Sequence, residues 1–428
     1  MTTREVLYGN WWLPSAPNCT VPGTLTLGEA AEPHLELYGT LIEFNAEEGP
    51  LVVHGDSNGR KVSLLRAYPT EETATFRGGR RYPVQLFDIT FGALIGGSHV
   101  ADEDDPKFPE STVEVDYLTF ISQDVDHSET AMTDKPDGAH EFNFTVTVDE
   151  SRSGRYGNID VTTISEASHS LDAEFHTAEM RIRASFRTYV RLTSAQPISI
   201  REHVETARRL SDLVTLAMHR PAGVRQIVFK ASTTDVLERY EWWCAETTSM
   251  NERLDMPTRR AIAFGLGGID LSTLLPAWHA LNTKAVYGVQ SIIGLQRETS
   301  TYHETKLLGV CGAVEALHRG LDPRNLTYRQ RCEALAGIPA SDAVAQIIPD
   351  IAKWADYVVK ARNSLAHGDE PKDRKVPENV WFALHEPTLA LLILVMMAEL
   401  GICEDSQLRA VTRGALRAAA RVGTAGLN

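Results

Sequence analysis

The pattern of apolar and polar residues changes near residue 200 of the 428-residue chain. Before that point the two kinds alternate in several segments, among them 24–27, 34–38, 111–120 and 141–148. Alternation with a period of two is typical of strands that bury one face and expose the other. Between two such segments, Asn58-Gly59 offers the positive φ that a tight hairpin turn needs. These patterns predict a β-rich sandwich or barrel.

The period becomes helical between residues 200 and 218, and one more strand is predicted at 224–229. Five apolar residues carry the helical repeat: Val204, Ala207, Leu210, Leu213 and Leu216. At least one helix is therefore expected to pack on the β-rich domain. We interpret residues 231–270 as the junction and place the boundary within it. The result is a β-rich sensor or regulatory domain at 1–265 and a second domain at 266–428.

From residue 271 onward nearly every segment has a helical pattern with a recognisable start signal. Thr301 and Thr327 each begin a Thr-x-x-Glu/Gln sequence, which is the signature of a capping box. Asp350 is a suitable N-cap for a helix over Ile351–His367, and Gly368 is a suitable residue to end it. These signals predict an all-α bundle.

The next helix is expected to open at Pro377 and to reach residue 400, with a kink or restart at Pro387. Its run 389–397 is apolar on all sides and must be centrally buried. The predicted fold class is α+β, with a β-rich N-terminal domain that carries at least one helix, followed by an all-α helical bundle.

The helix over Ile351–His367 contains the candidate active site. One face is apolar, and Asn363 and His367, four residues apart, share the opposite face. Arg362 lies about 140° round the helix axis from His367, at the border of the apolar face. The C-terminal end of a helix stabilises a cation, so the pKa of His367 is expected to be raised from its usual value of about 6.5.

An arginine beside a histidine that titrates near neutrality suits metal-free cleavage of RNA. The imidazole can move protons, and the guanidinium can hold a phosphodiester and stabilise the charge of the transition state. RNA supplies its own nucleophile, the 2′-hydroxyl, which DNA lacks. One histidine cannot take and give a proton at the same instant, so the chemistry predicts a two-fold dimer that brings two copies of His367 together.

The spacing alone leaves alternatives open. Arg297 and His303 fit a looser version of the same pattern, and we interpret them as a junction between two helices. At the candidate site itself, Arg362 could pair with a carboxylate of the bundle while His367 only caps a helix end. Glu315, inside an otherwise apolar helix, is a suitable partner for Arg362 in such a structural role.

The order of these motifs resembles a known family. The Arg362 to His367 helix, preceded by segments 310–317 and 328–335, resembles a HEPN domain, and with segments 9–14 and 38–41 the whole chain resembles the ApeA-like abortive-infection proteins. The resemblance implies a metal-independent endoribonuclease, active as a homodimer, that attacks RNA when a phage-derived trigger is sensed. By position, the family's arginine, intervening polar residue and histidine correspond to Arg362, Asn363 and His367.

The charge of −15 argues against a protein that coats nucleic acid without sequence preference. From Asp270 onward there are 17 of the 42 basic and 17 of the 57 acidic residues, so the whole acidic excess precedes it. It includes the acidic run at 102–105, and suggests that the first domain repels RNA or covers basic groups until a signal arrives. Near the C-terminus, four arginines recur at every fourth residue: Arg409, Arg413, Arg417 and Arg421. They are either an RNA-binding stripe on one terminal helix or a solvated face paired with acidic neighbours.

No cofactor and no metal are expected. The five cysteines are scattered without a Cys-x-x-Cys pair, and the histidines do not have the spacing of metal ligands. The stretch from Gly92 to Gly97 lacks the Lys and Ser/Thr of a phosphate-binding loop and is interpreted as a turn. Without a secretory leader or a membrane-spanning run, the protein is expected to be cytoplasmic. The rival function is a noncatalytic dimerisation or ligand-binding bundle joined to a β-domain that recognises a protein partner.

Overall fold

The computed structural model describes the chain apart from residues 1–3, 29–30, 44–48, 78–79, 123–124, 135–139, 149–150, 175–178, 234–235, 245–261, 299–301, 368–377 and 427–428. The chain forms two compact units. The first comprises Met1–Leu118, Asn158–Ser211 and Gly223–Leu254, and the second comprises Thr119–Gly157, Asp212–Ala222 and Asp255–Asn428. The chain therefore passes between the units several times. The domain boundary predicted after residue 265 remains a prediction.

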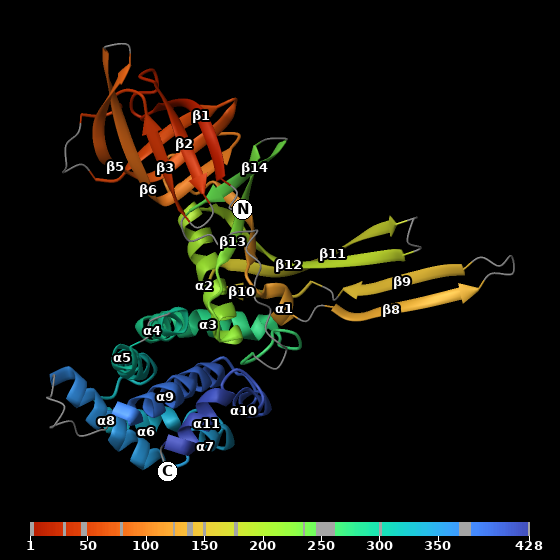
Figure 1. Cartoon of the computed structure of the whole chain (residues 1–428), viewed down its shortest axis with the longest axis vertical. Coiled ribbons are helices and arrows are strands. Elements are labelled where there is room, and N and C mark those ends of the chain that lie inside the picture. The colour runs from red at the N-terminus through yellow and green to blue at the C-terminus, as the bar shows by residue number, and fades with distance from the viewer. Residues whose placement is uncertain are drawn as a thin grey trace. The chain divides into compact units, whose positions relative to one another are not determined.

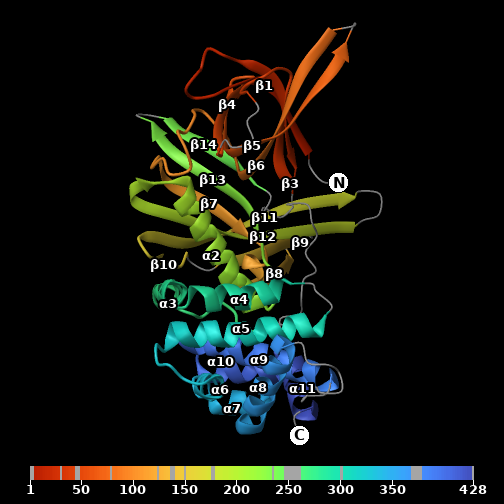
Figure 2. The ribbon, with the colours of Figure 1, turned by 90° about the vertical axis from the view of Figure 1, so that its left-hand side faces the viewer.

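Six antiparallel strands of the first unit close into a barrel (Figure 1, red to orange; Figure 2). They are β1 (Arg4–Trp12), β2 (Val21–Gly28), β3 (Ala31–Leu37), β4 (Leu51–Ser57), β5 (Arg60–Arg77) and β6 (Arg80–Gly96). Their order is β6-β3-β2-β1-β4-β5, and β5 pairs again with β6. Closure leaves no unpaired edge along this ring of strands. Of the sandwich and barrel alternatives, the β-rich region contains the barrel.

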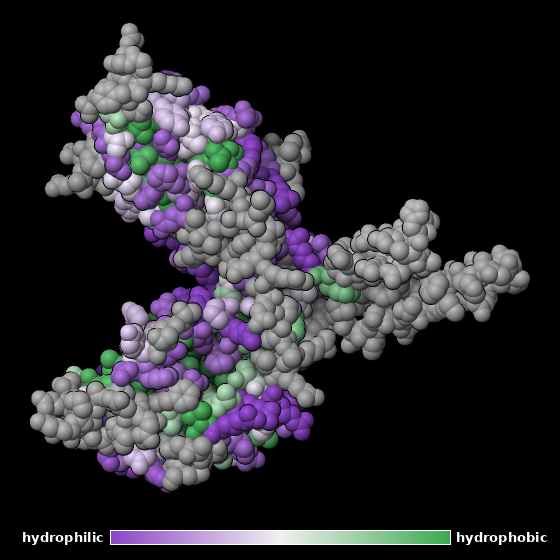
Figure 3. All heavy atoms as spheres, viewed as in Figure 1, coloured by the Kyte–Doolittle hydropathy of each residue, from purple (hydrophilic) through white to green (hydrophobic). Residues whose placement is uncertain are grey.

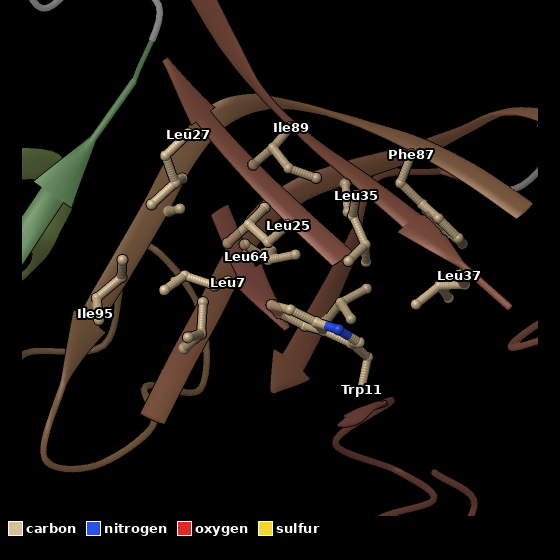
Figure 4. Close-up of a cluster of buried hydrophobic side chains, with 14 residues drawn as sticks. Leu7, Trp11, Leu25, Leu27, Leu35, Leu37, Leu64, Phe87, Ile89 and Ile95 are labelled. Atoms are coloured by element: carbon tan, nitrogen blue, oxygen red, sulfur yellow. The ribbon is translucent and has the colours of Figure 1, made fainter. Parts of the chain in front are cut away.

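The alternating pattern of these strands fills the barrel with apolar side chains (Figure 4). The labelled residues Leu25, Leu35 and Phe87 are fully buried there, as is the indole of Trp11. Gly55 lies against that indole so closely that a Cβ atom would stand 2.3 Å from the ring. The absence of a side chain at Gly55 in β4 therefore leaves the space that the indole of Trp11 occupies.

The hairpin between β4 and β5 forms where Asn58-Gly59 predicts it. Asn58 and Gly59 have φ angles of 53° and 85°, and the amide of Gly59 donates to Asp56 Oδ1 over 2.9 Å. The turn predicted from Gly92 to Gly97 is wrong, because β6 continues through Gly96. A Cβ atom at Gly92 would lie 2.4 Å from the ring of Trp242, so this glycine makes room for an aromatic side chain inside a strand.

A second group of strands continues from the barrel in the first unit. It consists of β7 (Phe108–Val115), β11 (Ile159–Glu174), β12 (Glu179–Ile198), β13 (Val224–Thr233) and β14 (Val236–Trp243), in the order β11-β12-β7-β13-β14, and β14 pairs with β6. The predicted strand at 224–229 is confirmed. The predicted strand at 111–120 ends early, because Tyr117 has a φ of 59° and Leu118–Ser122 forms the short helix α1. Part of the expected junction at 231–270 is also strand, since β14 lies within it.

Helix α2 (Ile200–Met218) has the predicted bounds. Its N-terminal part packs on β7, where the His203 ring lies 2.8 Å from Ser111 Oγ through Nδ1 and 3.0 Å from the Phe108 carbonyl through Nε2. Burial lowers the pKa of this histidine, which holds the helix on the sheet as a neutral ring.

Two histidines of the first unit stack on each other. The rings of His54 and His99 lie 4.2 Å apart and nearly parallel, and Trp12 packs edge-on against both. Burial is the largest cause that lowers the pKa of His99, to about 4, and a charge on His54 acts in the same direction. The stacked pair is therefore neutral at physiological pH.

We expect this pair to weaken the fold in mild acid. The unfolded chain takes up a proton at His99 near pH 6.5, and the folded chain does so only near pH 4, so the free energy of unfolding falls as the pH falls through this window. His99→Phe should flatten that part of the pH dependence. Urea unfolding followed by tryptophan fluorescence measures it at about pH 7.5 and about pH 5. An unchanged difference between the two pH values in the variant would contradict the assignment.

The second unit contains a hairpin, a short strand and the helical bundle. The strands are β8 (Val125–Asp134), paired with β9 (His140–Val148), and β10 (Ser153–Tyr156), which lies along α3. The helices are α3 (Leu271–Lys284), α4 (Val286–Arg297), α5 (His303–Leu321), α6 (Tyr328–Ala336), α7 (Ser341–Ile347), α8 (Ile351–His367), α9 (Glu378–Glu399), α10 (Glu404–Thr412) and α11 (Arg417–Gly426). The all-α bundle is confirmed.

Helix α9 is the centre of this bundle, and α5 packs against it as well as against α4, α6 and α8. The run from Leu389 to Met397 is buried on every side, as predicted. Pro387 lies inside the helix, which continues through it without a restart. Among the described helices, none has both the length and the apolar character that a bilayer crossing requires. Figure 3 shows one face of the molecule coloured by hydropathy, on which hydrophilic residues surround small hydrophobic areas.

Of the four predicted helix starts, those at Thr327 and Asp350 are confirmed. Thr327 and Gln330 form both halves of a capping box, and Asp350 Oδ1 accepts the amide of Lys353 over 2.9 Å at the start of α8. The prediction at Thr301 is wrong, because α5 begins after Tyr302, whose side chain makes no capping bond. Thr301 itself, Gly368 and Pro377 lie outside the described residues.

Candidate functional site

Helix α8 is fixed in the bundle by its apolar face. Trp354, Val358 and Ala361 are fully buried as predicted, and the indole of Trp354 donates to Thr388 Oγ1 of α9 over 3.0 Å. In the last turn the buried position is Ser364, and Leu365 is only half-buried. The buried face is thus rotated slightly at the end that carries the candidate site, and Arg362 and Asn363 are both half-exposed.

Arg362 is held in place from three directions. Its Nη2 atom lies 3.5 Å from Glu315 Oε2, its guanidinium carbon lies 4.9 Å from the centre of the Tyr328 ring, and its Nη1 atom donates to Asn363 Oδ1 over 3.4 Å. The predicted pairing with Glu315 is confirmed. A cation stacked on an aromatic face and paired with a carboxylate has a defined orientation. With 38% of its surface exposed, the side chain of Arg362 remains partly accessible to a ligand.

Glu315 is shared by three arginines. Besides Arg362, Arg319 Nη2 donates to Glu315 Oε1 over 2.7 Å, and Arg331 Nη1 lies 3.7 Å from the same oxygen. The side chain of Arg331 is only 7% exposed, and its Nε donates to the Leu326 carbonyl over 3.0 Å. One carboxylate therefore faces three guanidinium groups, which leaves the cluster with an excess of positive charge where α5, α6 and α8 meet. Such a surface favours a polyanion.

Tyr328 is a neutral platform for Arg362. Its hydroxyl donates to the carbonyl of Cys311 over 3.0 Å, and burial raises the pKa of the phenol far above neutrality. Burial also raises the pKa of the Cys311 thiol, to about 11. Neither group can therefore serve as an acid or base near pH 7. Sequence reasoning did not identify Tyr328, Arg319 or Arg331, because spacing along one helix does not tell which residues of another helix face it.

His367 is the last residue of α8, as predicted. Its side chain lies outside what the structure describes, so the approach of His367 to Arg362, and the effect of the helix end on its pKa, stay predictions. The backbone places the two residues in the same terminal turns of one helix, with Asn363 between them in sequence.

The second Arg-to-His match does not form a comparable site. Arg297 ends α4 and His303 begins α5, so the two residues belong to different helices, as interpreted. The guanidinium of Arg297 is engaged elsewhere. Its Nη2 atom lies 2.9 Å from Asp212 Oδ1 and donates a hydrogen bond to the Ala222 carbonyl over 3.1 Å. Its partners identify Arg297 as a structural residue.

The four C-terminal arginines do not lie on one helix, and this prediction is wrong. Arg409 belongs to α10, Arg413 is the C-cap of that helix, and Arg417 opens α11. The chain turns at Gly414, where a Cβ atom would stand 2.6 Å from the Ile262 carbonyl, and the amide of Ala415 donates to that carbonyl over 3.1 Å. Close backbone packing thus interrupts the stripe. Whether Arg409, Arg413 and Arg417 contact RNA remains a prediction.

The described residues include no group of three or more His, Cys, Asp or Glu side chains placed to hold a metal ion. The five cysteines are free, with Cys244, Cys311 and Cys332 buried and Cys19 and Cys403 exposed.

Two family models match the chain. A family model for ApeA N-terminal domain 1 matches residues 7–259, which is more than half of the chain, and a model for the Apea-like HEPN domain matches residues 308–406. The second match contains α8 and the whole arginine cluster. No curated protein and no solved structure matches the chain. HEPN domains are generally nucleases, and the ApeA-like HEPN group is linked to abortive infection. The chain belongs to the ApeA-like family, in which an ApeA N-terminal domain precedes a C-terminal HEPN domain.

Proposed function

We propose that the protein is a cytoplasmic abortive-infection effector whose HEPN domain cleaves RNA without a metal ion. One observation carries the proposal: Arg362 is oriented by Tyr328 and Glu315 yet remains 38% exposed, within a cluster that has more positive than negative charge. An oriented, accessible guanidinium beside the helix end that carries His367 is suited to a phosphodiester.

The reaction is an attack of the ribose 2′-hydroxyl on the adjacent phosphorus. The bond from phosphorus to O2′ forms, the bond from phosphorus to O5′ breaks, and the products end in a 2′,3′-cyclic phosphate and a 5′-hydroxyl. His367 takes the proton from the 2′-hydroxyl, and His367 of a second copy of the chain gives a proton to O5′. Arg362 stabilises the charge on the phosphoryl oxygens, and Asn363 fixes Arg362 through its side-chain oxygen.

The proposal includes a homodimer formed through the HEPN domain and a regulatory role for residues 1–265. The dimer provides the second histidine that the chemistry needs. The N-terminal domain senses a phage-derived trigger and restrains the nuclease until the trigger arrives. In this scheme Arg409, Arg413 and Arg417 are candidate contacts for the RNA backbone.

The test uses the full chain and defined RNA in the presence of a chelator, with and without extract of infected cells. The substrate contains several ribonucleotides, and a matched strand replaces each of them by its 2′-deoxy analogue. We expect cleavage of the RNA to fragments with cyclic phosphate ends, and none of the deoxy strand, because the nucleophile is missing. Equal cleavage of both strands would contradict attack by the 2′-hydroxyl. No cleavage of either strand, with or without the extract, would favour the rival function, a noncatalytic dimerisation or ligand-binding module.

A further inference from the structure

A pocket of about 650 Å³ lies in the second unit, between the chain that precedes α3 and one face of α10. The first wall is backbone-rich and runs from Ile262 to Ile269, with Gly265, Gly267 and Gly268 along it. The second wall is formed by Cys403, Ser406, Arg409 and Arg413. The volume of the pocket is within the range of about 300–1,000 Å³ that small-molecule sites usually have. This pocket is separate from the residues around Arg362.

The glycine-containing wall is held by hydrogen bonds to other parts of the same unit. The amide of Ala263 donates to the Ala217 carbonyl and that of Leu266 to the Ile121 carbonyl, each over 2.8 Å. The guanidinium of Arg152 donates to the Leu266 carbonyl over 2.6 Å. Because these hydrogen bonds within the unit already fix the wall, binding costs little further ordering of the backbone.

The opposite wall carries two cations. Arg409 and Arg413 are both exposed, and Arg409 Nη2 donates to Ser406 Oγ over 2.7 Å. Within the described residues, neither guanidinium forms an ion pair with a carboxylate, although the protein has a net charge of −15. Guanidinium groups bind phosphate through two parallel hydrogen bonds, which makes phosphate the best-matched anion for this wall.

The rest of the pocket matches the remainder of a nucleotide. Phe264 and Ala410, both almost fully buried, and the side chains of Ile262 and Ile269 give the lining an apolar part beside the two cations. A ligand with a phosphate group and a flat apolar ring would satisfy both parts. An RNA strand fits less well, because the chain turn at Gly414 separates Arg417 from the pocket and interrupts the row of cations that a backbone would follow.

We propose that this pocket binds a small phosphate-bearing ligand of nucleotide size, with Arg409 and Arg413 holding the phosphate groups. The ligand contacts both the chain segment that precedes α3 and helix α10. Its binding is therefore expected to stabilise the second unit against unfolding. The proposal does not depend on RNA cleavage. It assigns Arg409 and Arg413 to this ligand in place of the contact with the RNA backbone considered above.

The chain contains its own reporter for occupancy. Cys403 lines the pocket and is exposed, whereas Cys19 is exposed in the first unit, and the other three cysteines are buried. Hydrogen bonds from Ser406 lower the pKa of the Cys403 thiol, which favours its reaction with iodoacetamide. A ligand beside Arg409 should cover Cys403 and slow this reaction, and Cys19 should be unaffected.

The experiment measures alkylation of Cys403 and Cys19 in the full chain by peptide mass spectrometry, with millimolar ATP, inorganic tripolyphosphate or adenosine in a chelator. We expect saturable protection of Cys403 by ATP and tripolyphosphate and none by adenosine. Arg413→Gln should raise the half-protecting concentration of ATP by about tenfold or more, the usual result of losing a charged hydrogen-bond donor. Arg417→Gln is the matched control, and in this variant ATP should protect Cys403 at the same concentration as in the wild type. Cys311 must stay unreactive in each variant, which shows that the bundle is folded.

Three results would overturn the proposal. Absence of protection by both ATP and tripolyphosphate would mean that the pocket does not take phosphate. Equal protection in Arg413→Gln and in the wild type would place the ligand elsewhere. Protection by an RNA oligonucleotide but by neither small anion would identify the wall as an RNA contact instead. RNA cleavage is not part of any of these measurements, so a failed nuclease test leaves them unchanged.

Discussion

Substitution of His367 by alanine is expected to lower the rate of RNA cleavage by about 10²- to 10⁴-fold, the usual contribution of a general acid or base. In the proposed reaction both proton transfers depend on this residue, since the two copies of the dimer supply one imidazole each. The measurement is the single-turnover rate on a defined RNA in a chelator. Binding of the RNA, measured separately, should change little, because the histidine acts on protons and not on the phosphate charge.

His303 is the matched control for this prediction. It follows Arg297 in the looser Arg-to-His pattern, but those two residues belong to different helices. His303→Ala should therefore cleave RNA at the wild-type rate. If His367→Ala keeps the wild-type rate as well, the imidazole has no part in the chemistry, and His367 is better explained as a residue that ends a helix.

The features that sequence predicted best depend on neighbours in the chain. Helix α8 has the expected bounds because Asp350 caps its first turn and its apolar residues recur with helical spacing. The same applies to the hairpin at Asn58-Gly59, whose positive φ angles only a few residue types accept easily. In each case the deciding interaction lies within a few residues, so the local sequence is sufficient.

Features that depend on distant partners were missed. Gly92 was interpreted as part of a turn, but it lies inside β6. Its missing side chain leaves room for the ring of Trp242 in β14, about 150 residues later in the chain. Gly414 similarly allows close contact with the backbone at Ile262, which ends α10 and divides the predicted arginine stripe. A glycine that makes room for a distant group and a glycine that permits a turn cannot be told apart from the local pattern.

In the candidate site, too, features set by neighbouring residues were predicted and features set by distant partners were missed. The position of Arg362 on α8 follows from helical spacing, and its pairing with Glu315 was predicted because a carboxylate inside an apolar helix needs a partner. The stacking of Arg362 on Tyr328 depends on how α6 crosses α8, which no spacing within either helix specifies. The shared use of Glu315 by Arg319 and Arg331 was missed for the same reason.

The acidic run near residue 103 is engaged within the first unit. Glu103 accepts hydrogen bonds from Arg66 Nε over 2.8 Å and from Arg201 Nη2 over 2.9 Å, and Arg201 Nε lies 2.8 Å from Asp104 Oδ1. These carboxylates are therefore partly neutralised by their own unit. If the acidic excess of the N-terminal domain restrains the nuclease, acidic groups other than Glu103 must contribute most of the effect.

Substitution of Arg362 by lysine is expected to lower the single-turnover cleavage rate by about 10²-fold, the loss that follows removal of one oriented donor to a transition-state oxyanion. Lysine keeps the positive charge but loses the planar group that stacks on Tyr328 and pairs with Glu315. The ammonium is therefore not held in one direction. Affinity for RNA should fall only slightly, since it depends mainly on total charge.

Arg319→Lys separates orientation from charge, because Arg319 shares Glu315 with Arg362 but is 66% exposed and stacks on no aromatic ring among the described residues. Cleavage by this control should stay close to the wild-type rate. If both lysine variants instead lose cleavage and RNA affinity to the same extent, the three arginines act together as a binding surface. That result would remove Arg362 from the chemical step, while a loss of rate confined to Arg362→Lys would require the oriented guanidinium there.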